Sequence, residues 1–379
     1  MPAPGTRKAP VRWVDMTVEQ LISFARGAPS LDIVDIDGLK AAAARAFDAD
    51  PAGITGYGTS VGYPPLRKWI AEKHGVEVDQ VLVTNGSLQA DAFLFQHLLR
   101  PGDEVVVERP TYDRTLLNLQ RMGTKVHAVT IQPDGIDIDE LANLLGSGLR
   151  PKLAHIIPNF QNPAGVTLSL EKRRALLELA AEYDFTIFED DPYADIRFRG
   201  EPLPSMLALD DGNRVVHASS FTKTVCPGLR VGYLVGPADL IADIAKQATN
   251  LYISPGMVAQ AIVHQFCVSG DIDRSIRTVC TALGERAAAL AAALRAHIPG
   301  VRFTEPNGGY FLWIELPEDV HVDRVVPAAA ERGVAVVKGS DFLPEGGEHS
   351  LRLAYSAVTV DQIDEGVRRL AEAIEAVRG

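Results

Sequence analysis

Residues 152–191, KLAHIIPNFQNPAGVTLSLEKRRALLELAAEYDFTIFEDD, hold two short apolar runs separated by a longer helical segment. The runs KLAHIIPN (152–159) and FTIFEDD (185–191) predict strands, and the residues from Ser169 to Tyr183 predict a helix. Two strands joined through a helix are typical of a parallel sheet, because parallel strands need a long crossover connection. This stretch therefore predicts an α/β fold.

The same alternation extends on both sides of that unit. A helix is predicted from Ser87 to Leu99 and another from about Thr111. Further strands are predicted at VLVTN (81–85), EVVVERP (104–110), KVHAVTI (125–131), RVVHASS (214–220) and VGYLVG (231–236). The pattern predicts a large domain, residues 46–274, with a mainly parallel sheet covered by helices on both faces.

The remaining segments predict a smaller α+β domain, formed by an N-terminal arm (1–45) and the C-terminal part (275–379). Thr17 to Gln20 read as a capping box, and Leu39–Phe47 as a helix. After residue 298 we expect strands in VRFTEPNGGYFLWIELP (301–317), VAVVKG (334–339) and SLRLAYS (350–356), a helix at 323–332, and a last helix opened by Thr359 and Gln362.

Composition excludes several classes of protein. The formal net charge of -12 over 379 residues argues against a nucleic-acid surface, and we expect the basic cluster at residues 172–174 on a solvated helix face. The three cysteines, Cys226, Cys267 and Cys280, are too scattered for a disulfide framework or a zinc site, which favours a reducing compartment. No leader and no membrane-spanning run is recognisable, so we expect a cytoplasmic protein without membrane or nucleic-acid partners.

Polar residues follow the predicted strands, where ligands bind in open parallel sheets. They are Gly86-Ser87-Leu88-Gln89, Tyr112, Asn159, Asn162 to Gly165, Asp190, Tyr193, Ser220 to Lys223, and Arg230. Residues 86–89 are predicted at the N-terminus of a helix, a position that suits a phosphate. We expect Ser87, Ser220, Thr222 and Arg230 to bind this phosphate. The alternative is that Ser87 serves only as the N-cap of the helix. Neither a dinucleotide fingerprint nor a P-loop is present. The carboxylates at 189–191 lack histidines nearby, so we expect no metal, and Asp190 is expected to face a charge on a cofactor.

Four ordered motifs carry a resemblance to a family: NPAG (162–165), Asp190 three residues before Tyr193, SFTK (220–223), and Arg230 in GLRVGY. This combination resembles the fold-type I aminotransferases that use pyridoxal 5′-phosphate (PLP). The branch it resembles most is the α-aminoadipate and kynurenine aminotransferase group. The resemblance extends from about Phe24 to the end of the chain.

The resemblance implies a role for each residue near the cofactor. It implies that Lys223 forms a Schiff base with PLP and moves the proton, for which its amine must be unprotonated part of the time. Asp190 would meet the pyridine nitrogen, Tyr193 and Asn162 the ring hydroxyl, and Tyr112 the ring face. The phosphate would be bound by Ser87, Leu88, Gln89, Ser220, Thr222 and Arg230. For Tyr112, ordinary core packing stays an alternative.

The substrate side follows from the same resemblance. Arg352 matches the arginine that receives the α-carboxylate, with a structural salt bridge as its alternative, and Asn162 and Gly27 would lie beside it. Arg26 stands where this branch commonly has glycine, and it would bind a second substrate carboxylate or only cap a helix. Tyr57 resembles the tyrosine that reaches the phosphate of a neighbouring subunit, which implies a homodimer with shared sites.

The reaction implied is ping-pong transfer of an amino group from an α-amino acid to a 2-oxo acid, most often 2-oxoglutarate. Elimination or cyclisation of an amino acid on the same scaffold stays open as an alternative. A non-enzymatic ligand-sensing module is a further alternative, because this fold also occurs fused to DNA-binding domains.

Overall fold

The structure is a computed structural model, and it describes residues 21–378. The predicted capping box at Thr17 to Gln20 lies outside these residues. The large sheet has eight strands in the order β2-β9-β8-β7-β6-β3-β4-β5, of which β9 and β5 pair antiparallel to their neighbours. The strands are β2 (Val81–Thr84), β3 (Glu104–Arg109), β4 (Lys125–Gln132), β5 (Gly135–Ile136), β6 (Leu153–Ile156), β7 (Thr186–Asp190), β8 (Val215–Ser220) and β9 (Gly232–Val235).

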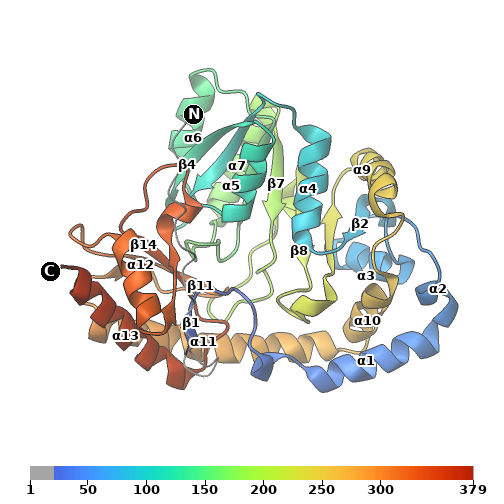
Figure 1. Cartoon of the computed structure of the whole chain (residues 1–379). Coiled ribbons are helices and arrows are strands. Elements are labelled where there is room, and N and C mark those ends of the chain that lie inside the picture. Colours follow the sequence, from blue (N-terminus) through green and yellow to red (C-terminus); the bar gives the residue numbers. More distant parts are fainter. Residues whose placement is uncertain (1–20, 379) are drawn as a thin grey trace, which may run out of the picture.

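Both faces of this sheet are buried, which explains the continuous apolar runs of its strands. In β3, Val105 and Val107 belong to one hydrophobic cluster, whereas Val106 points to another on the opposite face. Figure 1 shows α4, α5 and α7 lying against the sheet. The helices of this part are α3 (Pro64–His74), α4 (Ser87–Leu98), α5 (Asp113–Arg121), α6 (Ile138–Gly146), α7 (Leu170–Tyr183), α8 (Met206–Leu209), α9 (Ala238–Tyr252) and α10 (Met257–Val268). The predicted α/β fold is confirmed.

A second, antiparallel sheet has the order β10-β11-β14-β13 and packs with three helices (Figure 1). A short parallel pair, β1 with β12, ties Ile22 to Val334. The elements here are β1 (Ile22–Ser23), α11 (Asp271–His297), β10 (Arg302–Phe303), β11 (Phe311–Glu315), α12 (Val322–Glu331), β12 (Val334–Ala335), β13 (Val337–Lys338), β14 (Ser350–Ala354) and α13 (Val360–Arg378). Connecting elements are η2 (Leu31–Ile33), α1 (Ile36–Ala49), α2 (Pro51–Thr55), η3 (Val78–Gln80), η4 (Pro227–Leu229) and η5 (Gly339–Phe342).

The chain segments of the two predicted domains interleave. Residues 22–24 hydrogen-bond with the backbone near residues 335 and 354, within the predicted small domain. In contrast, α1, most of which was assigned to the small domain, packs against α10 of the large domain. Helix α11 continues across the predicted boundary between residues 274 and 275. The exact division into domains stays a prediction. Among residues 21–378, none of the helices is long and apolar enough to cross a bilayer.

The basic cluster on α7 differs from expectation. Arg173 is fully buried, and its guanidinium donates to the Asn159 side chain at 2.9 Å and to the carbonyl oxygens of Leu168 and Pro204 at 3.0 and 2.8 Å. Asn159 in turn donates to Asp191 at 2.8 Å. The expectation of a solvated face was wrong for this arginine because buried acceptors beneath β7 satisfy its donors.

Candidate active site

A cavity of about 320 Å³ lies at the carboxyl ends of the central strands. It brings together most of the residues predicted from the sequence: Gly27, Ser87, Leu88, Tyr112, Asn162, Asp190, Tyr193, Ser220, Thr222, Lys223, Arg230 and Arg352. Three predicted residues do not line it. Gln89 accepts a hydrogen bond from the Asn85 backbone at 2.8 Å, Arg26 is exposed, and the Tyr57 side chain is 90% exposed on the surface.

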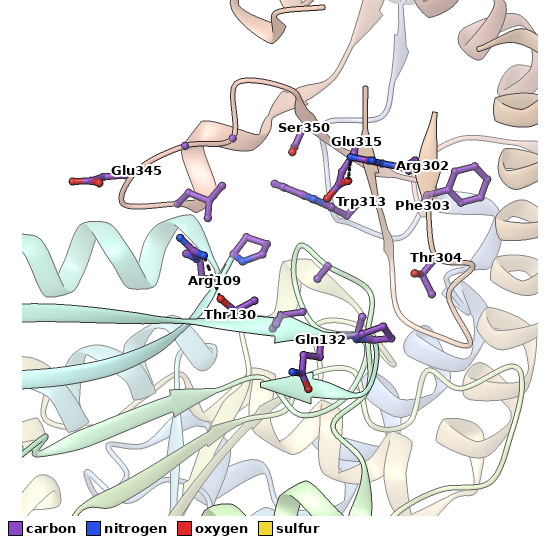
Figure 2. Close-up of a pocket in the computed structure, with 18 residues that line it drawn as sticks. Arg109, Thr130, Gln132, Arg302, Phe303, Thr304, Trp313, Glu315, Glu345 and Ser350 are labelled. Atoms are coloured by element: carbon purple, nitrogen blue, oxygen red, sulfur yellow. Dashed lines mark hydrogen bonds and ion pairs between the residues drawn. The ribbon is translucent and has the colours of Figure 1, made fainter. Parts of the chain in front are cut away.

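A larger hollow of about 600 Å³ opens elsewhere, between the edge of the large sheet and the small sheet. Figure 2 shows Arg109 and Thr130 on one side of it and Trp313 and Glu315 on the other. Its two lining arginines already have partners, since Arg109 donates to Thr130 at 3.2 Å and Arg302 pairs with Glu315 at 2.9 Å. We therefore assign the chemistry to the smaller cavity, where an amine, a carboxylate and guanidinium groups converge.

One end of the cavity is formed by the first turn of α4. Gly86 is the residue before the helix, with a φ of 89°, and a side chain there would collide with the guanidinium of Arg230. Because Gly86 and not Ser87 holds the cap position, and no side chain caps this helix, its first N–H groups remain available to an anion. Ser220 and Thr222 add two hydroxyls, which hydrogen-bond to each other at 2.8 Å. This end is suited to a phosphate.

Asp190 ends β7 and is 5% exposed. Its Oδ1 is buried and has no hydrogen-bond partner among the described residues. The expectation that no histidine lies near the carboxylates at 189–191 was wrong, because the fold brings Nε2 of His155 to 3.6 Å from Oδ2 of Asp190 and Nδ1 of His217 to 2.9 Å from Glu189. An unpaired buried carboxylate oxygen facing a cavity is costly unless a ligand donates to it. Asp190 is therefore placed to receive a cationic N–H group.

Two further buried carboxyls lie near Asp190. Burial, and to a lesser extent repulsion from Asp190, raises the pKa of Glu108 to about 8 and that of Asp91 well above its usual range. In both groups the shift favours the uncharged form of the carboxyl.

Lys223 is suited to proton transfer by its surroundings. Its Nζ donates to the Gly27 carbonyl at 2.7 Å and lies 4.9 Å from the ring centre of Tyr310. Burial, followed by the nearby cations Arg352 and Arg230, lowers the pKa of the amine to about 8. Roughly a tenth of a population with this pKa is unprotonated at pH 7, far more than for an ordinary lysine.

Arg352, on β14, faces the cavity from the small sheet and is 7% exposed. Its guanidinium donates to Oδ1 of Asn162 at 3.1 Å and to the Ala25 carbonyl at 2.8 Å, and it lies over the rings of Phe311 and Phe342, at 4.4 and 4.7 Å from their centres. These cation–π contacts help to hold the guanidinium in place without using its N–H donors.

Several lining residues were missed by the sequence analysis: Asp113, Arg114, Ile157, Pro192 and Phe311. Asp113 and Arg114 follow Tyr112 directly, so the same motif held the signal for them. Phe311, like Tyr310 beside Lys223, comes from a distant strand that carries no local motif.

Comparison with known proteins decides the family. The family model of class I and II aminotransferases matches residues 19–370. The chain belongs to this family. This aminotransferase is 34% identical to the 2-aminoadipate transaminase of Thermus thermophilus. The alignment extends over 364 residues and covers 94% of this chain and 91% of that protein. It is 32% identical to aromatic-amino-acid aminotransferase 1 of Thermococcus litoralis, over 98% and 92% of the two chains.

A solved structure supports the same assignment. The α-aminoadipate aminotransferase LysN from Thermus thermophilus, complexed with N-(5'-phosphopyridoxyl)-L-leucine, superposes with a TM-score of 0.90 at 32% identity and covers 95% of this chain and 93% of that one. The chain is an enzyme that transfers amino groups and uses PLP, which confirms those predictions over the ligand-sensing alternative. The residues present fit this cofactor, because the phosphate-binding end, the unpaired oxygen of Asp190 and the Lys223 amine face one cavity.

Proposed function

We propose that this aminotransferase moves the amino group of an α-amino acid to 2-oxoglutarate in two half-reactions within the 320 Å³ cavity. The observation that carries the proposal is that Lys223, Asp190 and Arg352, from three distant segments of the chain, line this cavity together. When bound, PLP supplies an electron-accepting ring that makes the Cα–H bond of the substrate acidic.

The residues near the cofactor have complementary tasks. With PLP bound, the unpaired Oδ1 of Asp190 would accept a hydrogen bond from the protonated ring nitrogen. Burial raises the pKa of the Tyr193 phenol well above its usual range, so Tyr193 stays a hydrogen-bond donor, and with Asn162 it would orient the ring hydroxyl. Tyr112 would pack against the ring, and Arg230 would bind the phosphate with Ser87, Leu88, Ser220 and Thr222.

With PLP bound, Lys223 would take the proton from the substrate Cα onto its Nζ, and in the second half-reaction it would deliver a proton to the Cα of the amino acid that forms. A lowered pKa suits this task, because the amine must both accept and release a proton near neutral pH. Arg352 binds the α-carboxylate by exchanging its contacts with Asn162 and Ala25 for the substrate. Gly27 lies where a side chain would collide with the ring of Phe311, so glycine allows this ring to approach the backbone closely.

A panel of donors tests the proposal. The panel contains 2-aminoadipate, glutamate, phenylalanine and leucine, each supplied with 2-oxoglutarate and the PLP-loaded protein. We expect one 2-oxo acid to form for each amino acid produced from the acceptor. An unsaturated or cyclic product that forms without any oxo-acid acceptor would instead establish the elimination or cyclisation alternative.

We also propose that the enzyme is a cytoplasmic homodimer in which Tyr57 reaches the phosphate of the neighbouring site. Tyr57 is 90% exposed, and other large apolar side chains are exposed with it, including Leu251 (62%) and Ile253 (55%). Ile253 has a φ of 67°, a conformation that costs a β-branched residue free energy and that is found at functional turns. Burying this surface against a second copy accounts for its composition.

A further inference from the structure

Three arginine side chains line the active site, and the proposed function uses two of them. Arg230 lies against Gly86 at the phosphate end, and Arg352 contacts Asn162 at the carboxylate end. The third is Arg114, the second residue of α5. It has no role in the transfer of the amino group as described above.

The guanidinium of Arg114 is available to a ligand. Its one contact with an acidic group is with the adjacent Asp113, where Nε and Oδ2 are 3.6 Å apart, which is too long for a good hydrogen bond. No hydrogen bond of its side chain occurs within residues 21–378, and the side chain is 56% exposed. Its five N–H donors therefore face the cavity and solvent.

The base of Arg114 is well fixed even though its tip is free. The Thr111 N–H donates to the Phe342 carbonyl at 3.0 Å, and Leu116 N–H donates to the Tyr112 carbonyl at 3.2 Å, which closes the first turn of α5. Tyr112 and Arg114 consequently keep a defined separation. Tyr112, Arg114 and Arg352 line the same cavity, so a substrate bound there is within one enclosure with all three side chains.

We infer that Arg114 binds the second carboxylate of dicarboxylic amino acids and 2-oxo acids, and so sets the preference for that substrate class. The inference rests on the proposed function. Arg26, the other candidate for this task, is exposed and does not line the cavity. A planar guanidinium with free donors is the group best suited to a bidentate carboxylate.

Asp113 moderates this preference. Asp113 lines the same cavity, and its negative charge favours the charged form of Arg352, which partly offsets the lowering of the arginine's pKa by burial. Asp113 and Arg114 together carry no net charge, so an apolar amino acid in the site does not face an excess of positive charge from this pair. The pair therefore tolerates uncharged side chains while still offering donors to a carboxylate.

The test compares kcat/KM for 2-aminoadipate with kcat/KM for phenylalanine in the PLP-loaded enzyme. In Arg114→Gln we expect the ratio of the two to fall about 10- to 100-fold, and in Arg114→Lys to fall less, because lysine keeps the charge but loses the fork. Asp113→Asn should raise the ratio. Arg121→Gln, an exposed arginine on the last turn of the same helix, is the matched control and should leave the ratio unchanged.

Calorimetric binding gives a second measurement that needs no turnover. Glutarate, a dicarboxylate, should bind Arg114→Gln at least about tenfold more weakly than the parent, whereas the difference for butyrate should be much smaller. An unchanged ratio and unchanged glutarate binding in Arg114→Gln, or losses confined to Arg26→Gln, would overturn the inference. Failure of the parent enzyme to transfer an amino group from any donor would instead contradict the proposed function.

Discussion

At the scale of single residues, Lys223 owes its reactivity to its neighbours. A lysine in water titrates near 10.4, and here burial and two nearby arginines lower the pKa of the amine to about 8. The sequence motif SFTK located this lysine but gave no information on Tyr310, whose hydroxyl donates to the Lys223 carbonyl at 3.0 Å. Tyr310 is 87 residues away along the chain, so its contact with Lys223 is created only by the fold.

The first prediction concerns the titration of this amine in the cofactor-free protein. Reductive methylation requires an unprotonated amine, so labelling of Lys223 should rise with pH and reach half its maximum near pH 8. Replacing Arg352 by glutamine removes a nearby cation and should move this midpoint upward. Mass spectrometry of the digested protein measures the labelling, and a midpoint near 10.4 in the parent would contradict the account of the site.

The second prediction separates the hydroxyl of Tyr310 from its ring. Tyr310→Phe should lower the free energy of unfolding by about 1 kcal/mol, because it leaves the partly buried Lys223 carbonyl without this donor. Tyr310→Leu also removes the ring that stabilises the ammonium form, so it should lower the pKa of Lys223 below that in Tyr310→Phe. Urea unfolding and the labelling profile measure the two effects, and identical profiles in both variants would exclude a role for the ring.

At the scale of elements, the phosphate end depends on how closely β9 approaches the start of α4. A side chain on Gly232 would lie 2.5 Å from the backbone nitrogen of Ser87. The sequence predicted both the strand and the helix start, since each has a local signal. It did not predict their contact, because β9 lies between β2 and β8 through antiparallel pairing that no local pattern specifies.

The third prediction follows from that contact. Gly232→Ala should push the first turn of α4 away and weaken PLP binding by at least about tenfold, because the N–H groups no longer converge on the phosphate. Gly228→Ala is the control, since its side chain would meet only the Cys226 sulfur at an ordinary 3.6 Å. Equilibrium dialysis measures the affinities for PLP. Equal affinities in the two variants would show that the close contact between β9 and α4 does not determine PLP binding.

At the scale of the whole molecule, the site combines segments from both ends of the chain. Gly27, Arg352 and Phe311 approach from the side of the small sheet, and Lys223, Asp190 and Ser87 from the large one. The sequence predicted this convergence where residues follow strands of the large sheet or match a family motif. It missed Phe311, which lines the cavity because of tertiary packing, and Arg114, although Arg114 follows Tyr112 by two residues. It expected Arg26 and Gln89 to line the cavity, which they do not.

The fourth prediction tests whether two copies share their sites. Lys223→Ala and Tyr57→Ala each damage every site of their own dimers. In a mixed dimer, one site receives Lys223 from one copy and Tyr57 from the other and is therefore intact. When equal amounts of the two variants are unfolded, mixed and refolded, random pairing makes about half of the dimers mixed. Each mixed dimer has one intact site out of two, so about a quarter of all sites should be active. Activity equal to the mean of the two parents would show that Tyr57 does not act across subunits.

The attachment of PLP to Lys223 is the most direct test of the central claim. The purified enzyme is loaded with PLP, reduced with borohydride and digested, and the modified peptide is identified by mass spectrometry. The account predicts a reduced phosphopyridoxyl group on Lys223 and its loss in Lys223→Ala. A label on another lysine, or none after loading with PLP, would contradict it.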